Sequence, residues 1–128
     1  GKDMEDKSFQ KIFGVLESVL PEHWKRLVLF AGYTQGSYTM KYYVKDDNDL
    51  YTDCFSQNVI GNAQLIKVFM NIDKIIKIER DKLDDKSKWS VMTMIVDADG
   101  NMKTEFDYSD ISEDSIGYEQ NWRKKYIH

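Results

Sequence analysis

The sequence predicts an α+β fold, an antiparallel β-sheet of four to five strands with helices packed on it, in the order α-β-β-(β)-α-β-β-α. Three observations lead to this fold class. Apolar residues recur at helical spacing in three segments, they alternate with polar residues in others, and strong turn signals separate the alternating segments. The 128 residues contain no repeat and no Pro/Gly/Ser-rich linker, so we expect one domain over residues 1–128. Residues 1–3 are consistent with an expression remnant.

The first element is a helix at about residues 5–20. Its apolar positions, three or four residues apart, are Phe9, Ile12, Phe13, Leu16 and Leu20. Pro21 ends the helix because proline lacks a backbone donor and disfavours helical geometry in the residue before it.

A β-hairpin follows the first helix. Residues 25–33 are apolar and rich in β-formers, residues 34–37 form the turn, and residues 38–45 alternate between apolar and polar side chains. The acidic turn at residues 46–49 precedes a short third strand at about residues 50–55. A second helix is expected at residues 62–83, with its charged residues mainly on the side opposite the apolar stripe.

A second hairpin begins near Trp89. Residues 89–96 are apolar on both faces, which predicts a central strand. Asp99 and Gly100 form a strong turn signal. In the partner strand, residues 102–108, alternation predicts that Met102, Phe106 and Tyr108 are buried and that Lys103, Glu105 and Asp107 point outward into solvent.

The last element is a helix at about residues 113–126. Ser112 is the expected N-cap, with Glu113 and Asp114 in the first turn. Three basic residues, at positions 123–125, fall in the last turn, where they complement the helix dipole. The apolar stripe of this helix consists of Tyr118, Trp122 and Tyr126.

Composition limits the classes of function. The net charge is −4 and the pI is about 5.2, which disfavours direct nucleic-acid binding because such proteins cluster Lys and Arg against phosphate. No apolar run reaches the roughly 20 residues of a membrane span, and the polar start is unlike a secretory signal, so we expect a cytoplasmic protein. The single cysteine, Cys54, is interpreted as a small buried hydrophobic residue.

Catalytic and metal-binding patterns are missing from the sequence. The only histidines are His23, in the turn after the first helix, and His128, the last residue. The segment starting at Asp97 resembles a calcium loop at first, but its sixth and twelfth positions lack the required glycine and glutamate. Glu105 and Asp107 share one strand face, which we interpret as solvated and therefore unsuited to acid–base chemistry. We expect no enzyme activity, cofactor or metal.

The acidic residues are unevenly distributed. Residues 97–114 contain seven acids and one base, and a second acidic cluster occupies residues 46–53. Aspartate is common in turns and favours solubility, which accounts for such residues without a function. The alternative is a negative patch that steers a basic partner. Under that alternative, the predicted contacts are Asp97, Asp99, Asp107, Asp110, Glu113 and Asp114, followed by Asp46, Asp47 and Asp49.

Several segments together resemble the YezG-like immunity proteins. These segments are Leu20 to Lys25 leading into an apolar strand, Trp89 at the head of a strand, the Asp99-Gly100 turn, Phe106 to Tyr108, and a closing helix with Trp122 and Lys125-Tyr126. The resemblance runs from about Phe9 to Tyr126, and between Tyr38 and Asn62 it is one of general character only. Its strength lies in the order and spacing of motifs that are individually weak.

The resemblance implies a bacterial antitoxin that binds the C-terminal domain of a polymorphic toxin, commonly a nuclease with a basic surface, by steric and electrostatic occlusion. It supplies no catalytic residues. A different hypothesis from the residues themselves is a regulatory domain that binds a small molecule between the sheet and the C-terminal helix. The expected oligomeric state is a monomer or a weak homodimer, because either sheet edge is able to pair with another chain.

Overall fold

The protein is described over residues 4–57 and 59–128 by a computed structural model, and these residues form three helices and five strands in the predicted order. They divide into two compact units. The helical unit comprises the chain up to Pro21 and Gln57–Lys88, and the sheet unit comprises Glu22–Ser56 and Trp89–His128. The α+β class and the element order are thereby confirmed, whereas the single-domain organisation stays a prediction.

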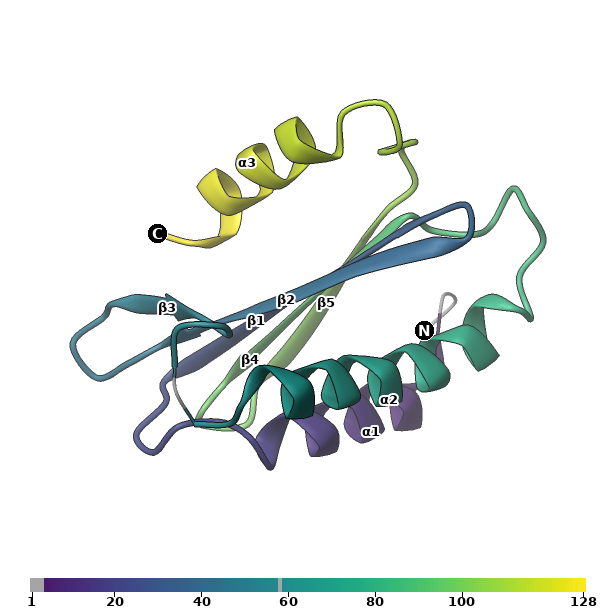
Figure 1. The fold of residues 1–128 in the computed structure, drawn as a ribbon. Coiled ribbons are helices and arrows are strands. Elements are labelled where there is room, and N and C mark those ends of the chain that lie inside the picture. The colour runs from purple at the N-terminus through teal and green to yellow at the C-terminus, as the bar shows by residue number, and fades with distance from the viewer. Residues whose placement is uncertain (1–3, 58) are drawn as a thin grey trace. The chain divides into compact units, whose positions relative to one another are not determined.

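The helical unit contains α1 (Asp6–Glu17) and α2 (Asn62–Arg80), which contact each other. Both helices were predicted from their apolar periodicity. Their buried positions include Ile12 and Leu16 on α1 and Ile72 and Ile76 on α2. The two helices run antiparallel, because the backbone N–H of Glu5 at the start of α1 donates to Glu79 Oε2 near the end of α2, at 2.8 Å (Figure 1).

The buried Glu79 carboxylate replaces a side-chain cap for α1. Glu5, the N-cap residue, makes no capping hydrogen bond with its own side chain. Burial works to raise the pKa of the Glu79 carboxyl, but the Glu5 amide and Lys82 outweigh it, and the pKa is lowered. An ionised carboxylate at the N-terminus of α1 also interacts favourably with the helix dipole.

The sheet unit contains one antiparallel sheet in the order β3-β2-β1-β4-β5. Its strands are β1 (Arg26–Thr34), β2 (Ser37–Lys45), β3 (Tyr51–Asp53), β4 (Val91–Asp97) and β5 (Met102–Asp107). Two hairpins meet through β1 and β4, which are far apart in sequence but register Arg26 against Asp97. β4 is central and buried along its length apart from Asp97, as its two apolar faces predicted.

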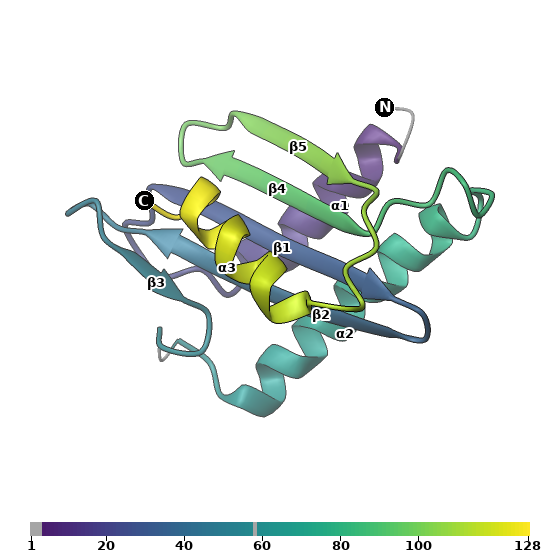
Figure 2. The same cartoon turned by 90° about the horizontal axis from the view of Figure 1, so that it is seen from above.

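Helix α3 (Ser115–Tyr126) lies over one face of this sheet and crosses its central strands (Figures 1 and 2). Trp122 is its anchor: it is 5% exposed and packs edge-on against Phe30, with the ring centroids 5.0 Å apart. The core beneath α3 combines aromatic and β-branched side chains, namely Val28, Phe30, Tyr43, Val91, Ile95, Ile111 and Trp122.

Gly32 gives this core room for the loop before α3. A Cβ atom at position 32 would lie 2.9 Å from the ring of Phe30 and 3.3 Å from Ile111, so a larger residue would push the loop away from the sheet. The interpretation of Cys54 as a small buried residue is also confirmed.

The predicted orientation of β5 is wrong at Glu105, Asp107 and Tyr108, and Met102 and Phe106, which were predicted to be buried, are only partly buried. Glu105 and Asp107 do not point into open solvent but face α3 and are partly buried, whereas Tyr108 is 52% exposed. Alternation along a strand shows which residues share a face, but it does not show which of the two faces is covered by other elements. Here the later helix returns over the face that carries the carboxylates, so a pattern typical of a solvated face belongs to a covered one.

The predicted N-terminus of the last helix is also wrong. The N-cap is Asp114, whose Oδ1 accepts the backbone N–H of Gly117 at 2.9 Å, and Ser112 lies outside the helix. Ser112 instead donates its hydroxyl to Asp110, at 2.6 Å. Both residues are good N-cap types, so residue type alone could not separate them. The three basic residues do occupy the last turn, as predicted.

Candidate functional site

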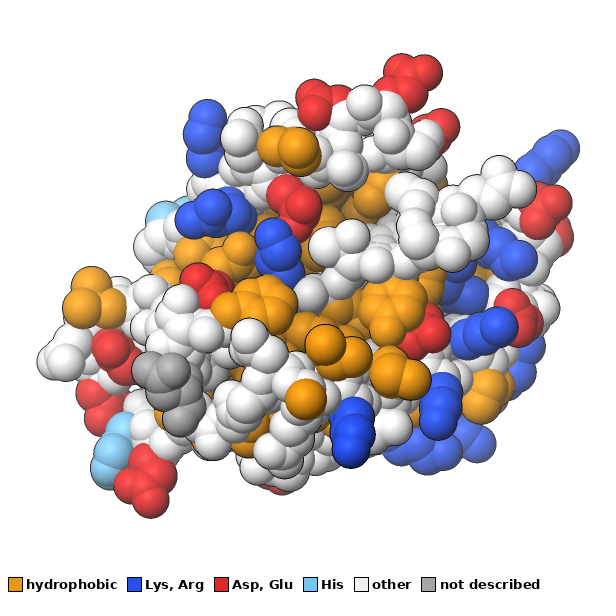
Figure 3. Space-filling view, viewed as in Figure 1, with side chains coloured by type: hydrophobic (Ala, Val, Ile, Leu, Met, Phe, Trp, Pro, Cys, Tyr) orange, Lys and Arg blue, Asp and Glu red, His pale blue; other side chains and the backbone are white. Residues whose placement is uncertain are grey.

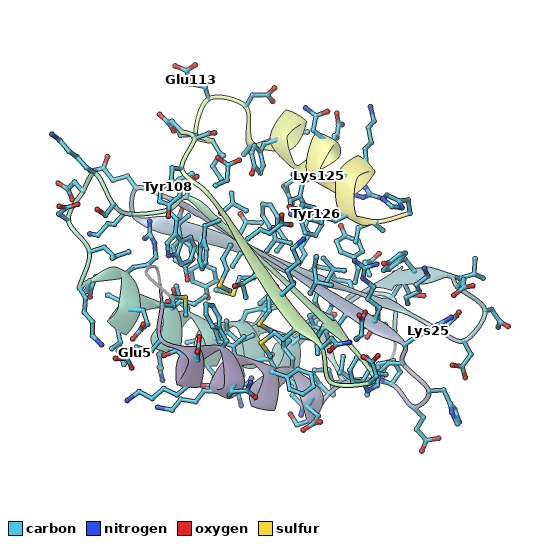
Figure 4. All side chains as sticks on the ribbon, turned by 180° about the vertical axis from the view of Figure 1, so that it is seen from behind. Glu5, Lys25, Tyr108, Glu113, Lys125 and Tyr126 are labelled. Carbon is cyan, nitrogen blue, oxygen red and sulfur yellow. The ribbon has the colours of Figure 1, made fainter. Side chains whose placement is uncertain are left out.

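A groove lies between α3 and the free edge of β5. It has a volume of about 550 Å³ and combines aromatic walls with charged and polar groups. Figure 4 shows Tyr108 at the end of β5, Lys125 and Tyr126 on α3, and Glu113 at the outer tip of the connecting loop. The groove is lined by Thr93, Glu105, Phe106, Asp107, Tyr108, Ser109, Tyr118, Asn121, Trp122, Lys125 and Tyr126.

Two carboxylates of β5 are held in this groove by tyrosines of α3. Tyr118 Oη donates to Asp107 Oδ2 at 2.5 Å, and Tyr126 Oη donates to Glu105 Oε2 at 2.8 Å. Burial and the hydrogen bond to Glu105 raise the pKa of Tyr126 to about 12, and the same two causes, with Asp107 as acceptor, raise the pKa of Tyr118. Both phenols therefore remain protonated near neutral pH and act as donors.

Asp107 is more fully hydrogen-bonded than Glu105. Its Oδ1 accepts both the backbone N–H and the hydroxyl of Ser109, at 2.9 and 2.6 Å. Burial opposes ionisation, but the hydrogen bonds from Ser109 and Tyr118 prevail, and the pKa of Asp107 is lowered. Asp107 is therefore ionised near neutral pH and fixed in place, a structural carboxylate that also contributes negative charge.

Behind the carboxylates, the floor of the groove is rigid. Thr93 lies directly across the ladder from Glu105, and it is 3% exposed. Its Oγ1 accepts the indole N–H of Trp122 at 2.8 Å. The buried indole thus has its hydrogen-bond partner, as a core tryptophan requires.

The nine predicted contact acids lie at two ends of the sheet rather than in one patch. Asp97 and Asp99 occupy the β4–β5 turn, whereas Asp107 lies at the opposite end of β5, from which the chain continues through Asp110, Glu113 and Asp114. The strand register places Lys45 and Asp97 on either side of Arg26. The β2–β3 turn with Asp46, Asp47 and Asp49 therefore shares the end with Asp97 and Asp99.

Basic residues offset the acids at the first of these ends. Lys25 Nζ contacts Asp49 Oδ1 at 2.8 Å, and Arg26 Nε lies 3.9 Å from Asp97 Oδ1. Hydrogen bonding and the charge of Lys25 lower the pKa of the exposed Asp49. No ion pair is found for Asp107, Asp110, Glu113 or Asp114 among the described residues, so the end of β5 next to α3 carries the less compensated negative charge.

Many of these acids also stabilise turns. Asp46 Oδ1 accepts the backbone N–H groups of Asn48 and Leu50, and Asp114 caps α3. Asp110 Oδ1 accepts the N–H and the hydroxyl of Ser112, which lowers the pKa of Asp110. The two explanations of the acidic clusters are compatible, because a carboxylate that forms a turn remains charged. For the exposed Asp47 and Glu113, no such side-chain hydrogen bond is found among the described residues.

Charge is distributed unequally between the two units. The sheet unit contains 8 Lys and Arg against 13 Asp and Glu, a net charge of −5, and the helical unit contains 10 against 9, a net charge of +1. Figure 3 shows acidic side chains gathered before the start of α3 and lysines gathered over α2. The acidity of the protein therefore belongs entirely to the sheet unit.

Within residues 4–57 and 59–128, no group of three or more His, Cys, Asp and Glu side chains could hold a metal ion, and no helix is long and apolar enough to cross a membrane. His23 is an exposed turn residue with φ of 62°, near Asp47. The prominent features are instead a preformed groove and a charged surface, which are typical of proteins that bind other proteins.

Comparison with known families agrees with that class. The chain belongs to the YezG-like immunity protein family, whose model matches residues 6–128. No curated protein matches the chain. The family places the protein among immunity proteins, and the match covers all of α1 to α3, both hairpins and the groove.

The groove contains residues that sequence reasoning did not single out as a site. Tyr118, Tyr126 and Lys125 were assigned only to the core stripe and the basic last turn of the helix. The available signal was the combination of two alternate acids on β5 with two tyrosines eight residues apart on the last helix, with Trp122 midway between them. This combination indicates a site only once the helix is known to cover the face of β5 that carries the two acids.

Proposed function

We propose that the protein neutralises a cognate bacterial toxin by binding its C-terminal domain, with no chemical reaction of its own and in the cytoplasm of the producing cell. The observation that carries this proposal is the family match over residues 6–128. The toxin is proposed to be a basic nuclease, and the sheet unit to supply the contacts.

Charge supports the sheet unit as the binding surface. A nuclease needs a basic surface to hold phosphate, and the net charge of −5 on the sheet unit is complementary to it. Long-range attraction of this kind raises association rates by about one to three powers of ten at low salt. The helical unit, with a net charge of +1, offers no such attraction.

Tight inhibition requires more than charge. Nanomolar affinity corresponds to about −12 kcal/mol, which an interface of about 1,600 Å² reaches when a few aromatic side chains act as anchors. The partly exposed Tyr108 and the tyrosines of the groove are side chains of this type. The groove is also where a small-molecule ligand was expected, but membership of an immunity protein family favours a protein partner.

The direct test starts from the gene directly upstream of this one: where that gene encodes a toxin, the two genes are co-expressed. Rescue of growth together with a stable, purifiable complex supports the proposal. Death of the cells despite expression of the folded protein contradicts it, as does turnover of a substrate by the protein alone.

The electrostatic part of the proposal needs variants that spare the fold. Asp107, Asp110 and Asp114 form internal hydrogen bonds, so their reversal would disturb the structure as well as the charge. The exposed residues Asp99 and Glu113 are better choices, because no side-chain hydrogen bond of Glu113 is found among the described residues and those of Asp99, all from Asn101, are long, at 3.3 and 3.4 Å.

The double variant Asp99→Lys, Glu113→Lys should slow association with the toxin by about tenfold at low ionic strength and flatten its salt dependence. The double variant Asp81→Lys, Asp85→Lys reverses two exposed acids of the helical unit, is the control matched in charge, and should change the rate less than twofold. Equal effects of the two variants on the association rate, measured by stopped-flow, would contradict the sheet unit as the toxin-binding surface.

A further inference from the structure

We propose that the groove between α3 and β5 binds an arginine side chain of the toxin, with its guanidinium group against Glu105 and its plane against the tyrosine rings. This inference rests on the proposed function and specifies the chemistry of the partner at one site. It depends on the free acceptor capacity of Glu105, the aromatic walls and the local charge.

Glu105 has an oxygen available for a ligand. Tyr126 occupies Oε2, and the charged neighbour of Oε1 is Lys103, whose Nζ lies 4.0 Å away, beyond hydrogen-bond distance. The Glu105 side chain is 37% exposed, while that of Lys103 is 70% exposed and able to move aside. The carboxylate is thus oriented by Tyr126 but only partly satisfied, the state in which an additional donor gains most.

The walls of the groove suit a planar cation. Tyr108 is 52% exposed, and Tyr118 and Tyr126 contribute rings from α3. The ring of Tyr126 already attracts a cation, because Lys125 Nζ lies 5.2 Å from its centroid. Guanidinium stacks on such rings and is more weakly hydrated than ammonium, so it loses less on entering a partly enclosed site.

The charge of the groove selects a cation. Glu105 and Asp107 are lining carboxylates and Lys125 is the lining cation, which leaves the lining with a net negative charge. The loop from Asp110 to Asp114 adds further negative charge after β5. Arginine fits better than lysine because its planar guanidinium can donate to Glu105 Oε1 while its face lies against a tyrosine ring, whereas an ammonium group is a strongly hydrated point charge.

The test uses N-acetyl-arginine amide as the probe and N-acetyl-citrulline amide as its uncharged isostere. The indole N–H of Trp122, which donates to Thr93 beside Glu105, is the NMR reporter. We expect a saturable shift of this signal with a dissociation constant on the order of millimolar for the arginine probe, and binding at least about fivefold weaker for citrulline. No saturable shift, or equal binding of the two probes, overturns the inference.

Variants then locate the binding group. Glu105→Gln should reduce binding of the arginine probe to the citrulline level, whereas Glu113→Gln, an exposed acid outside the groove, should change it less than twofold. Circular dichroism confirms that each variant is folded, and the comparison of the two probes on the unmodified protein needs no variant at all. Arginine binding that is indifferent to Glu105→Gln contradicts the assignment.

The purified toxin domain separates this inference from the proposed function. We expect Glu105→Gln to weaken the complex at least about tenfold, mainly through faster dissociation, as for a buried charge pair that loses one partner. A tight complex that tolerates Glu105→Gln contradicts the arginine site and leaves the immunity role intact. Arginine binding without any complex contradicts the immunity role instead.

Discussion

The helical unit and the sheet unit use different side chains to form their cores. In the helical unit, α1 and α2 bury mainly aliphatic residues such as Leu16, Ile72 and Ile76. In the sheet unit, the core under α3 is built around Trp122, which contacts the rings of Phe30, Tyr43 and Tyr126. Aliphatic packing requires only volume and shape, whereas the aromatic core also brings hydroxyl and indole groups that need polar partners.

That difference explains why the groove is in the sheet unit. The hydroxyls of Tyr118 and Tyr126 reach the edge of their core and find carboxylates on β5. The helical unit also has a buried carboxylate, Glu79, but it accepts its hydrogen bonds from Glu5 and Lys82 within the same unit. The helical unit therefore uses its polar contacts to join its own elements. In the sheet unit, by contrast, one oxygen of Glu105 can still accept a hydrogen bond from a ligand.

The largest expected effect is the loss of the aromatic anchor. Trp122→Ala should lower the free energy of unfolding by about 3–5 kcal/mol, because it leaves a cavity and removes the donor to Thr93. Ile72→Val, in the aliphatic core of the helical unit, should cost about 0.5–1.5 kcal/mol. Urea unfolding measures both values. A Trp122→Ala cost no larger than that of Ile72→Val would contradict the role assigned to the tryptophan.

A medium effect is expected at Glu79 in the helical unit. Glu79→Gln keeps the shape but weakens the hydrogen bond from Glu5, and should cost about 1–2 kcal/mol at pH 7. Because the pKa of Glu79 is lowered on folding, its stabilisation is present above the unfolded-state pKa, about 4.5, and is lost as the pH falls through the folded-state value.

The difference between wild type and Glu79→Gln should therefore shrink as the pH falls below about 4.5, as measured by urea unfolding at several pH values. Glu17→Gln, an exposed glutamate on α1, is the control and should show neither the cost nor this pH dependence. A pH-independent difference would mean that the charge of Glu79 does not contribute.

A smaller effect is expected at the start of α3. Asp114→Ala should cost about 1 kcal/mol, because the N–H of Gly117 loses its capping acceptor. The neighbouring Glu113→Ala should cost less than about 0.5 kcal/mol, since Glu113 is exposed and no hydrogen bond or ion pair of its side chain is found among the described residues. Thermal unfolding of the pair distinguishes a structural acid from one that is available for a partner. Equal losses would contradict the assignment of the cap.

The sequence predicted those elements whose periodicity is local. The apolar stripes of α1 and α2 and the alternation of β2 were sufficient to predict these three elements. The two apolar faces of β4 correctly indicated a central strand. The pairing of β1 with β4 is not encoded locally, because any two apolar strands are able to pair. The burial of Glu105 and Asp107 depends on that pairing and on the later return of α3, so it could not be read from β5 alone.

The same limit applies to the predicted contacts. The sequence placed Asp46, Asp47, Asp49 and Asp99 in turns, and that location is confirmed. Sequence proximity suggested one patch for residues 97–114, but a six-residue strand separates its two halves by roughly 20 Å. Charged residues that are close in the sequence lie close together on the surface only when the chain turns back between them, and an extended strand keeps them apart.

The smallest expected effect concerns the exposed apolar residues of the helical unit. Ile66 and Met70 are 57% and 48% exposed and lie one helical turn apart on α2, with Lys67 between them in the sequence. Apolar residues of this kind can serve as an interface, but scattered exposure is also normal. If the sheet unit binds the toxin, Ile66→Gln with Met70→Gln should change toxin affinity less than about twofold and stability by less than about 0.5 kcal/mol. Isothermal titration calorimetry measures the toxin affinity of this variant. A loss of affinity above about tenfold would place the interface on α2 and contradict the sheet unit as the binding surface.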